Sequence, residues 1–392
     1  MINKLKLVSG LIYIQFFHAL AENINYIFIT LYLWRQFSIT SVIQFRIYEL
    51  ILIPVMVLIV GYLLDRVSAK ISFLIGLVTF FIQLILFIYL GENSVNYLVP
   101  LALLSGMSTS FRFLSLNIIS QNAVEIKDQI KYFSQIDINS KLINIGFPVI
   151  SGLLVYLFGY NFIFSLAILS ILIIIKLVLL APIKINQNSY SPYMVYKDWD
   201  KEKTILFVVN FFWGIEYALF ATLIPIIVTI MLNGELGWGI FTSIISLIGV
   251  GYSYFFQKSE LLNKSIASLV IFGFIITTAS IMFVVNPGII FFFIFMIFLQ
   301  LWQSTQMIGL KPLMNKIIKN EPNSSILTTE FNVFMEIPFM IGRLLLLLIL
   351  FVVGSDLENL RMVGFLFAIL GFIPLYESKF VIRSKQAIQK AI

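Results

Sequence analysis

The chain has no cysteine and very few charged residues for its length. Of its 392 residues, 11% are Asp, Glu, Lys or Arg, and there is one histidine. Without cysteine there is no disulfide, no thiolate metal ligand and no thiol nucleophile, and one histidine cannot build a histidine metal centre. A soluble domain of this size would need far more polar groups to cover its surface. The sequence therefore excludes a soluble protein, and it predicts neither a metal site nor a cofactor.

Most of the chain consists of hydrophobic residues. Hydrophobic residues make up 60% of the chain, and its mean hydropathy is +1.00. Windows of about 20 apolar residues predict an all-α polytopic membrane protein with twelve transmembrane helices. Their expected spans are 8–34, 40–64, 71–90, 97–120, 132–158, 160–182, 204–232, 236–256, 266–286, 288–310, 324–353 and 358–378.

The net charge of +7 follows the expected membrane topology. With both termini in the cytoplasm, most of the 26 Lys and Arg residues fall in cytoplasmic segments, and only Arg35 and Arg361 fall in outside loops. This asymmetry is that of the positive-inside rule, so the basic charge needs no nucleic-acid partner. Lys4 and Lys6 precede an apolar stretch longer than a signal-peptide core, so we expect the first helix to be retained. The abundance of Ile, Lys and Asn favours an AT-rich bacterial genome and hence a bacterial plasma membrane.

A short charged turn joins the second and third expected helices. It reads Gly61-Tyr62-Leu63-Leu64-Asp65-Arg66-Val67-Ser68-Ala69-Lys70. This turn resembles the G-x-x-x-D-R-x-G-R-K signature of the major facilitator superfamily, a family of membrane transporters. Ser68 stands in place of the second glycine, and Ala69 in place of the first of the paired cations. The resemblance implies twelve helices in two pseudo-symmetric six-helix bundles, with the substrate site near the midplane where the bundles meet.

The resemblance also implies a gating role for the turn. In the family, the aspartate lies against the cytoplasmic start of the eleventh helix and helps to hold the cytoplasmic gate shut. Here that start reads Pro322-Asn323-Ser324-Ser325, a good N-cap whose unpaired amides and positive dipole end would attract Asp65. The alternative is a solvated loop with a chance Asp-Arg pair. The expected gating residues are Gly61, Asp65, Arg66 and Lys70.

Two short motifs recur at one spacing, which indicates an internal duplication. Gly61-Tyr62 recurs as Gly251-Tyr252, and Pro148-x-x-x-Gly152 recurs as Pro338-x-x-x-Gly342, both at an offset of 190 residues. The longest polar segment lies near the middle of the chain. We therefore expect an N-terminal bundle at 1–183, a cytoplasmic linker at 184–203, and a C-terminal bundle with a short basic tail at 204–392.

The fifth expected helix carries a degenerate antiporter motif. It runs Gly146-Phe147-Pro148-Val149-Ile150-Ser151-Gly152, which resembles the G-P-x-x-G-G motif that the family associates with drug exporters. The resemblance implies that Pro148 and Gly152 form a hinge, since proline kinks a helix and small residues allow close helix approach. Two positions depart from the motif, so Gly and Pro that merely pack the bundle are the alternative.

Ionisable residues inside the expected helices carry the most chemical information, because each must be paired, neutralised or exposed to water. Glu22 lies near the middle of the first helix, with His18 and Asn25 about one turn to either side. A carboxylate near the midplane could load and release a proton close to neutral pH. For each such residue the alternative is a structural ion pair or a permanently neutral acid. The proton-coupling candidates are Glu22, Glu216, Glu336 and Asp137.

Further polar residues are candidates for a substrate cavity. Arg112 in the fourth helix has no obvious local counter-ion. It could pair with Asp137 on the next helix, or Asp137 could pair with Lys141 at i,i+4 and leave Arg112 to the cavity. The cavity candidates are His18, Asn25, Arg112, Asn210, Trp213, Gln300 and Gln303.

These features together predict a secondary transporter that works by alternating access, and not an enzyme. No phosphate-binding loop of the Walker type is present, so a proton gradient and not ATP would drive it. The resemblance is closest to bacterial exporters of drugs and macrolides, which implies proton-coupled export of a small amphipathic molecule by a monomer in the lipid bilayer. An uptake symporter or a lipid exporter of the same fold is the alternative. A polytopic membrane enzyme is a remote one, because the loops are too short for a catalytic domain.

Overall fold

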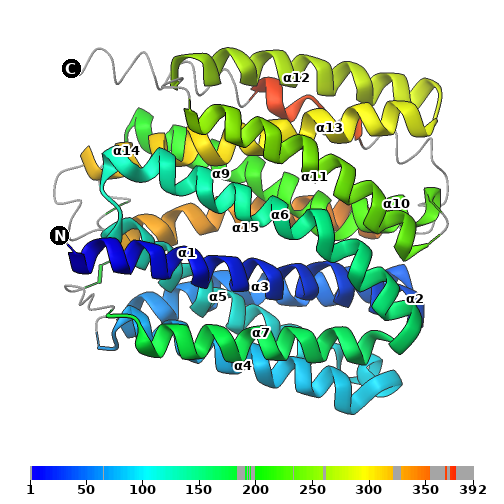
Figure 1. The fold of residues 1–392 in the computed structure, drawn as a ribbon, viewed down its shortest axis with the longest axis horizontal. Coiled ribbons are helices and arrows are strands. Elements are labelled where there is room, and N and C mark those ends of the chain that lie inside the picture. The colour runs from blue at the N-terminus through cyan, green and yellow to red at the C-terminus, as the bar shows by residue number, and fades with distance from the viewer. Residues whose placement is uncertain are drawn as a thin grey trace.

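The chain folds into one bundle of long helices, all running along its long axis (Figure 1). The structure is a computed structural model that describes residues 2–64, 66–182, 190–191, 193, 195, 199–232, 234–258, 262–320, 328–353, 367–368 and 371–376. Every regular element in that part of the chain is a helix, which confirms the predicted all-α class. By length and hydropathy, eight helical stretches of the described residues could cross a membrane.

The helices before residues 184–203, the expected linker that we call the linker below, follow the first six expected spans closely. The first of them is one long helix interrupted by a π turn, so it has three parts. The elements are α1 (Ile2–Asn23), η1 (Ile24–Phe28), α2 (Ile29–Gln36), α3 (Ile39–Leu64), α4 (Ala69–Leu90), η2 (Gly91–Tyr97), α5 (Leu98–Ala123), α6 (Ile126–Phe158) and α7 (Tyr160–Leu180).

The helices after the linker follow the next five expected spans. The twelfth expected span, 358–378, falls largely outside the described residues. The elements are α9 (Lys201–Ala218), η3 (Leu219–Leu223), α10 (Ile224–Met231), α11 (Glu235–Lys258), α12 (Leu262–Val285), α13 (Ile289–Thr305), η4 (Gln306–Leu310), α14 (Lys311–Asn320) and α15 (Thr328–Val353).

Local sequence explains where several helices begin. Ser68 caps α4 by accepting a hydrogen bond from the Ile71 amide at 3.4 Å, and Asp200 caps α9 by accepting one from the Lys203 amide at 2.7 Å. Between α6 and α7 the chain turns at Gly159, whose φ of 77° favours glycine. Ser68, one of the two departures from the family signature, is therefore the N-cap residue of α4.

Three of the described helices contain a π turn, a rare feature that is frequent at functional sites. Two of these turns, η1 and η3, occupy corresponding places in the first helix before the linker and the first helix after it. The extra residue of a π turn breaks the helical period. Asn25, inside η1, is fully buried with a side-chain amide that has no partner among the described residues, whereas Glu22, one turn earlier, pairs with Arg112 of the neighbouring helix α5.

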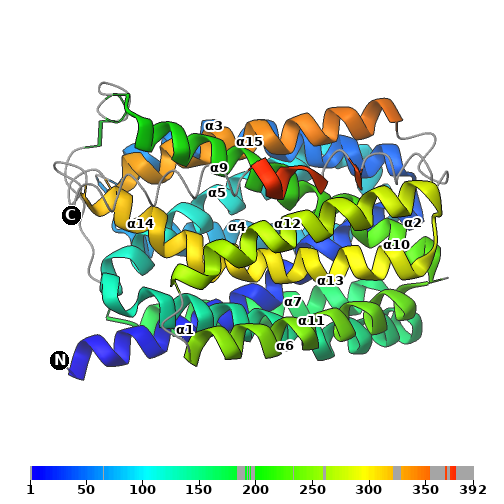
Figure 2. The same ribbon diagram turned by 90° about the horizontal axis from the view of Figure 1, so that it is seen from above.

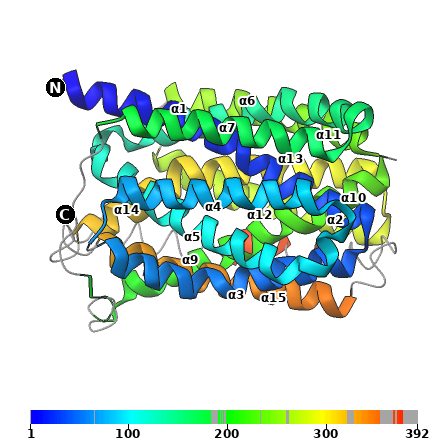
Figure 3. The ribbon, with the colours of Figure 1, turned by 90° about the horizontal axis from the view of Figure 1, so that it is seen from below.

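The helices before and after the linker meet along two opposite edges of the bundle. Figures 2 and 3 show α3 beside α15 on one edge and α6 beside α11 on the other, and both pairs are in contact. Along the second edge the backbones approach closely. A Cβ atom on Gly239 of α11 would lie 2.7 Å from the Pro148 carbonyl oxygen of α6, so glycine is required there. We call the end of the bundle that holds Gly61 and Tyr190 the linker end and the opposite end the far end.

Candidate functional site

A central cavity of about 310 Å³ lies between the helices before and after the linker. Its wall is built from η1 and the end of α1, from α6, from α9 and η3, and from α11 and α13. Three residues predicted from sequence line it: Asp137, Gln300 and Gln303. The other polar lining residues include Asn23, Ser140, Lys141, Asn144, Thr242 and Ser246, and the aromatic ones are Tyr26, Tyr217, Phe220, Trp238 and Phe241.

Asp137 and Lys141 form an ion pair in the wall of this cavity. The Lys141 ammonium donates to Asp137 Oδ2, to Ser304 Oγ at 2.5 Å and to Ser253 Oγ at 3.3 Å, so all three of its protons have acceptors. The Lys141 side chain is 2% exposed and that of Asp137 is 13% exposed. The pair therefore ties α6 to α11 and α13, and it leaves the cavity wall with no net charge from these two groups.

The polar residues of α6 follow one helical face. Asp137, Lys141 and Asn144 are spaced i, i+4 and i+7, and all three line the cavity. Sequence reasoning considered the first two as a pair but did not extend the face to Asn144. A polar stripe on an otherwise apolar helix is a signal that could have found it.

A second ion pair is buried among the helices before the linker. Arg112 of α5, which is 1% exposed, donates to Glu22 Oε1 of α1, and its Nε donates to Ser108 Oγ at 3.0 Å. His18 Nε2 lies 3.3 Å from Arg112 Nη1 and 3.7 Å from Glu22 Oε1. The guanidinium also lies over the Phe80 ring, 4.2 Å from its centroid. The counter-ion of Arg112 is thus Glu22, and His18, Glu22 and Arg112 form one cluster apart from the central cavity.

Glu216 lies in a different environment, between α9 and the α13–η4 helix. Its two oxygens accept hydrogen bonds from Trp302 Nε1 at 3.1 Å and from Gln306 Nε2 at 3.0 Å. Of its predicted neighbours, Asn210 donates to the Leu206 carbonyl of its own helix at 2.7 Å, and Trp213 keeps its indole N–H without a partner among the described residues. Glu216, Asn210 and Trp213 therefore lie where α9 packs against its neighbours, and none of the three lines the central cavity.

The predicted gating turn is only partly described. Asp65 and residues 321–327, the expected contact of its carboxylate, lie outside the described residues. The Lys70 ammonium donates to the carbonyls of Leu179 and Ala181, both at 2.9 Å, and so closes the end of α7. Arg66 is exposed. A Cβ on Gly61 would lie 2.6 Å from the ring of Tyr190, so this ring of the linker packs directly against Gly61.

Four buried amides join the two sets of helices at the linker end. Gln121 of α5 and Asn332 of α15 exchange hydrogen bonds of 3.3 and 2.9 Å. Asn315 of α14 accepts from Gln121 at 3.3 Å and donates to Gln129 of α6 at 3.2 Å. We call Gln121, Gln129, Asn315 and Asn332 the amide clasp. At the far end, α2 packs on α10, and the Thr30 hydroxyl, whose nearer acceptor is the Tyr26 carbonyl at 2.6 Å, lies 3.2 Å from the Ala221 carbonyl.

Removing one member of the amide clasp should make the cavity easier to reach from the linker end. A hydrogen bond contributes about 1 kcal/mol, and Asn332→Leu loses the exchange with Gln121, so we expect opening to increase by roughly fivefold or more. Ser140, which lines the cavity, can be changed to Cys as the only thiol of the chain. Its labelling rate by a membrane-impermeant thiol reagent, applied from the linker side, measures the opening.

The matched control for the clasp variant is Asn122→Leu. Asn122 is an exposed amide beside the clasp, and in the described part of the chain its side chain bonds to the Ile118 carbonyl of its own helix alone, at 2.8 Å. Its removal should leave the labelling rate of Ser140→Cys unchanged. Equal labelling in Asn332→Leu, in Asn122→Leu and in the parent would show that the clasp does not hold the linker end together.

Comparison with known proteins identifies the family of this chain and solved structures with a similar fold. Residues 11–327 match the family model described as Major Facilitator Superfamily. The structure is similar to a bacterial homologue of the iron transporter ferroportin in an outward-facing state, with a TM-score of 0.71 and 12% identity over 98% of this chain and 99% of that one. It is also similar to the E. coli fucose:proton symporter, with a TM-score of 0.66 and 13% identity over 96% of this chain and 99% of that one.

A third similar structure is the human organic anion transporter MFSD10, with a TM-score of 0.62 and 9% identity over 95% of this chain and 99% of that one. No curated protein matches the chain. At these identities the structures show the fold alone, whereas the family model extends across helices on both sides of the linker, including those that line the cavity. The predicted all-α fold of the major facilitator superfamily is confirmed, and this chain is a multi-pass membrane protein that belongs to the major facilitator superfamily of transporters.

Proposed function

We propose that this protein is a proton-coupled secondary transporter that exports a small amphipathic molecule by alternating access. The observation that carries the proposal is the central cavity of about 310 Å³, whose wall comes from helices on both sides of the linker. Contacts of different kinds join the two sets of helices at the two ends of the cavity: the amide clasp at the linker end, and the packing of α2 on α10 at the far end. Alternate breaking of these contacts would expose the cavity to one side at a time.

The cavity wall suits an amphipathic molecule. Its volume lies near the lower end of the range of about 300–1,000 Å³ for small-molecule sites. Five aromatic side chains supply apolar surface, and Gln300, Gln303 and Asn144 supply hydrogen-bonding groups. Export, rather than uptake, is supported by the resemblance of the segment 146–152 in α6 to the antiporter motif.

We infer that two carboxylates are the best candidates for coupling transport to protons. A coupling group has to exchange its proton with water in at least one state, and the side chains of Glu22 and Asp137 are 18% and 13% exposed. The side chain of Glu336 is 5% exposed, and Glu216 is buried with a donor on each oxygen. Protonation of Glu22 would leave the buried Arg112 without its counter-ion. Because an unpaired buried charge is costly, the cluster of His18, Glu22 and Arg112 would have to rearrange. Glu22 is therefore the leading candidate, with Asp137 second.

Glu22→Gln should abolish gradient-driven accumulation and spare downhill exchange. Glutamine keeps the size and hydrogen bonding of glutamate but cannot exchange a proton. The purified protein would be placed in vesicles with an imposed proton gradient, and ethidium and other small amphipathic dyes would serve as probes. Both transport against the dye gradient and exchange in its direction would be measured.

Glu216→Gln and Asp137→Asn complete the series. We expect the Glu216→Gln variant to accumulate dye nearly as the parent protein does. In the parent, Trp302 and Gln306 enclose the Glu216 carboxylate and keep it from exchanging a proton with water. Accumulation at the parent level by Glu22→Gln would move the coupling role to Asp137. If every dye moves only together with protons in the same direction, the protein is an uptake symporter and the export proposal fails.

A further inference from the structure

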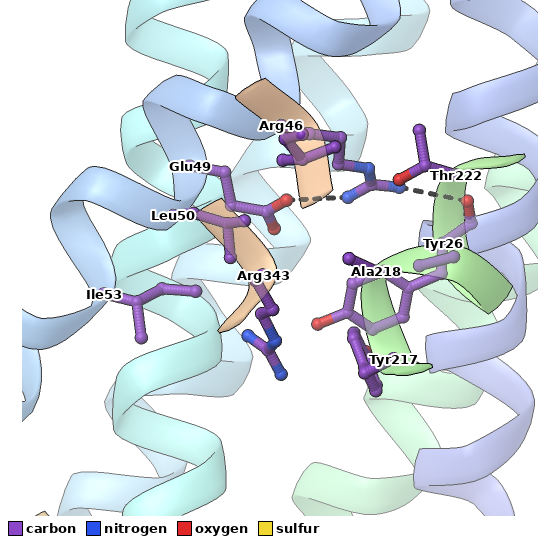
Figure 4. A pocket seen from close by; sticks show the side chains of 11 residues that line it. Tyr26, Arg46, Glu49, Leu50, Ile53, Tyr217, Ala218, Thr222 and Arg343 are labelled. Atoms are coloured by element: carbon purple, nitrogen blue, oxygen red, sulfur yellow. Dashed lines mark hydrogen bonds and ion pairs between the residues drawn. The ribbon is translucent and has the colours of Figure 1, made fainter. Parts of the chain in front are cut away.

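A second, smaller pocket lies beside the central cavity where η1, α3, α9, η3 and α15 meet (Figure 4). Its volume is about 20 Å³, enough for one particle of about the size of a water molecule. Tyr26 and Tyr217 line both the pocket and the central cavity. Their rings pack edge to face with centroids 5.3 Å apart, so they form a partition between the two spaces.

Arg343 lines this pocket from α15, and its charge is poorly matched by its surroundings. The residue is 4% exposed, and its Nε is buried without a partner among the described residues. Its ion-pair partner, Glu336, lies 3.9 Å from Nη1, which is beyond hydrogen-bond distance.

Among the described residues, aromatic rings and not hydrogen-bond acceptors lie against this guanidinium. Its central carbon lies 4.2 Å from the ring centroid of Tyr217 and 3.9 Å from that of Phe339. Such contacts attract a cation but accept no conventional hydrogen bond from its N–H groups. Because burying a charged donor without an acceptor is costly, Arg343 needs a further acceptor at this pocket.

The other charged groups of the pocket are largely satisfied. Arg46 donates to Glu49 Oε2 at 2.7 Å, to the Tyr26 carbonyl at 3.0 Å and to Thr30 Oγ1 at 3.0 Å, and only its Nε lacks an acceptor in the described part of the chain. The second oxygen of Glu49 accepts from Ser105 Oγ at 2.5 Å. Figure 4 shows Arg46 and Glu49 projecting from α3 toward the pocket, with Arg343 on the neighbouring helix. The carboxylate of Glu49 is thus already held by its own helix and by α5.

We propose that this pocket binds a small anion, held by Arg343 with help from Arg46. A volume of about 20 Å³ admits a halide ion or one end of a carboxylate, and it is too small for sulfate or phosphate. Two sources share this chemistry: an inorganic anion such as chloride, or the carboxylate of a molecule in the central cavity that passes between Tyr26 and Tyr217. In either case the anion supplies charge-assisted acceptors to guanidinium N–H groups.

The test is anion-dependent thermal unfolding of the purified full-length protein. Chloride would be raised from zero at constant ionic strength by replacing sodium methanesulfonate, whose tetrahedral sulfonate is as bulky as sulfate, with sodium chloride, and a second series would use sodium acetate. We expect a saturable rise in Tm of about 2 °C or more for the parent protein, and no anion-specific rise for Arg343→Gln. Arg35→Gln, which removes an exposed arginine of α2, should behave as the parent does.

The possible outcomes distinguish the two sources of the anion from each other and from the absence of an anion site. A chloride effect that requires Arg343 assigns an inorganic anion, and an acetate effect alone that requires Arg343 assigns the carboxylate of a transported molecule. Absence of any effect in the parent, or an equal effect in all three proteins, overturns the site. If Arg343→Gln does not fold, Arg343→Lys keeps the charge but loses the planar donor set, and its half-maximal anion concentration should rise about tenfold. An unchanged half-maximal concentration would equally overturn the proposal.

Discussion

Lys141→Met should destabilise the protein by about 3–5 kcal/mol, the usual effect of removing one partner of a buried ion pair. The change would leave Asp137 in the cavity wall without its counter-ion, and Ser253 and Ser304 without the ammonium that ties them to α6. Thermal unfolding and the yield of monodisperse protein on size exclusion would measure the loss. Lys176→Met, an exposed lysine of α7, is the matched control and should be close to neutral.

The double variant Asp137→Asn with Lys141→Met tests the reason for that loss. If the unpaired charge is responsible, neutralising Asp137 as well should recover much of the stability, because the remaining amide and thioether carry no buried charge. A double variant no more stable than Lys141→Met would show that packing against Gly249, which the lysine side chain contacts closely, dominates instead.

Gly214→Ala and Gly342→Ala should each be strongly destabilising, by about 3 kcal/mol or more. The two glycines lie on facing surfaces of α9 and α15. A Cβ on Gly214 would overlap the carbonyl oxygen of Phe339, and a Cβ on Gly342 would overlap that of Phe211. Because both obstacles are backbone atoms inside helices, neither can rotate away, and the two helices would have to separate.

Gly251→Ala provides the matched control for these glycines. Gly251 is also a helical glycine, but a Cβ there would meet no heavy atom of the described residues within 4 Å. Alanine should therefore be neutral or stabilise the helix by up to about 1 kcal/mol. Urea or thermal unfolding in detergent would compare the three variants. Similar stability of Gly214→Ala, Gly342→Ala and Gly251→Ala would contradict the close approach of α9 and α15.

The sequence alone determined the features that depend on short stretches of chain. Helix spans could be read because a membrane helix is an apolar window of about 20 residues. The ion pair of Asp137 with Lys141 could be weighed as an alternative because i,i+4 neighbours share a helical face. The turn at 61–70 identified the family because it is one continuous motif, and the matching residues 11–327 bear this out.

The tertiary structure alone decided which distant residues meet. Arg112 lies 90 residues from Glu22, and no local pattern joins them. The amide clasp was missed because its four residues come from four helices, and each amide by itself reads as an ordinary helix-end residue.

The π turns were missed as well, because an inserted residue leaves the apolar composition unchanged. The inserted residue does rotate the remainder of the helix, so Asn25 no longer lies on the same helical face as Glu22. Hydropathy is a property of each segment, whereas contacts between helices depend on their rotation and register. Those are settled only when the whole bundle packs.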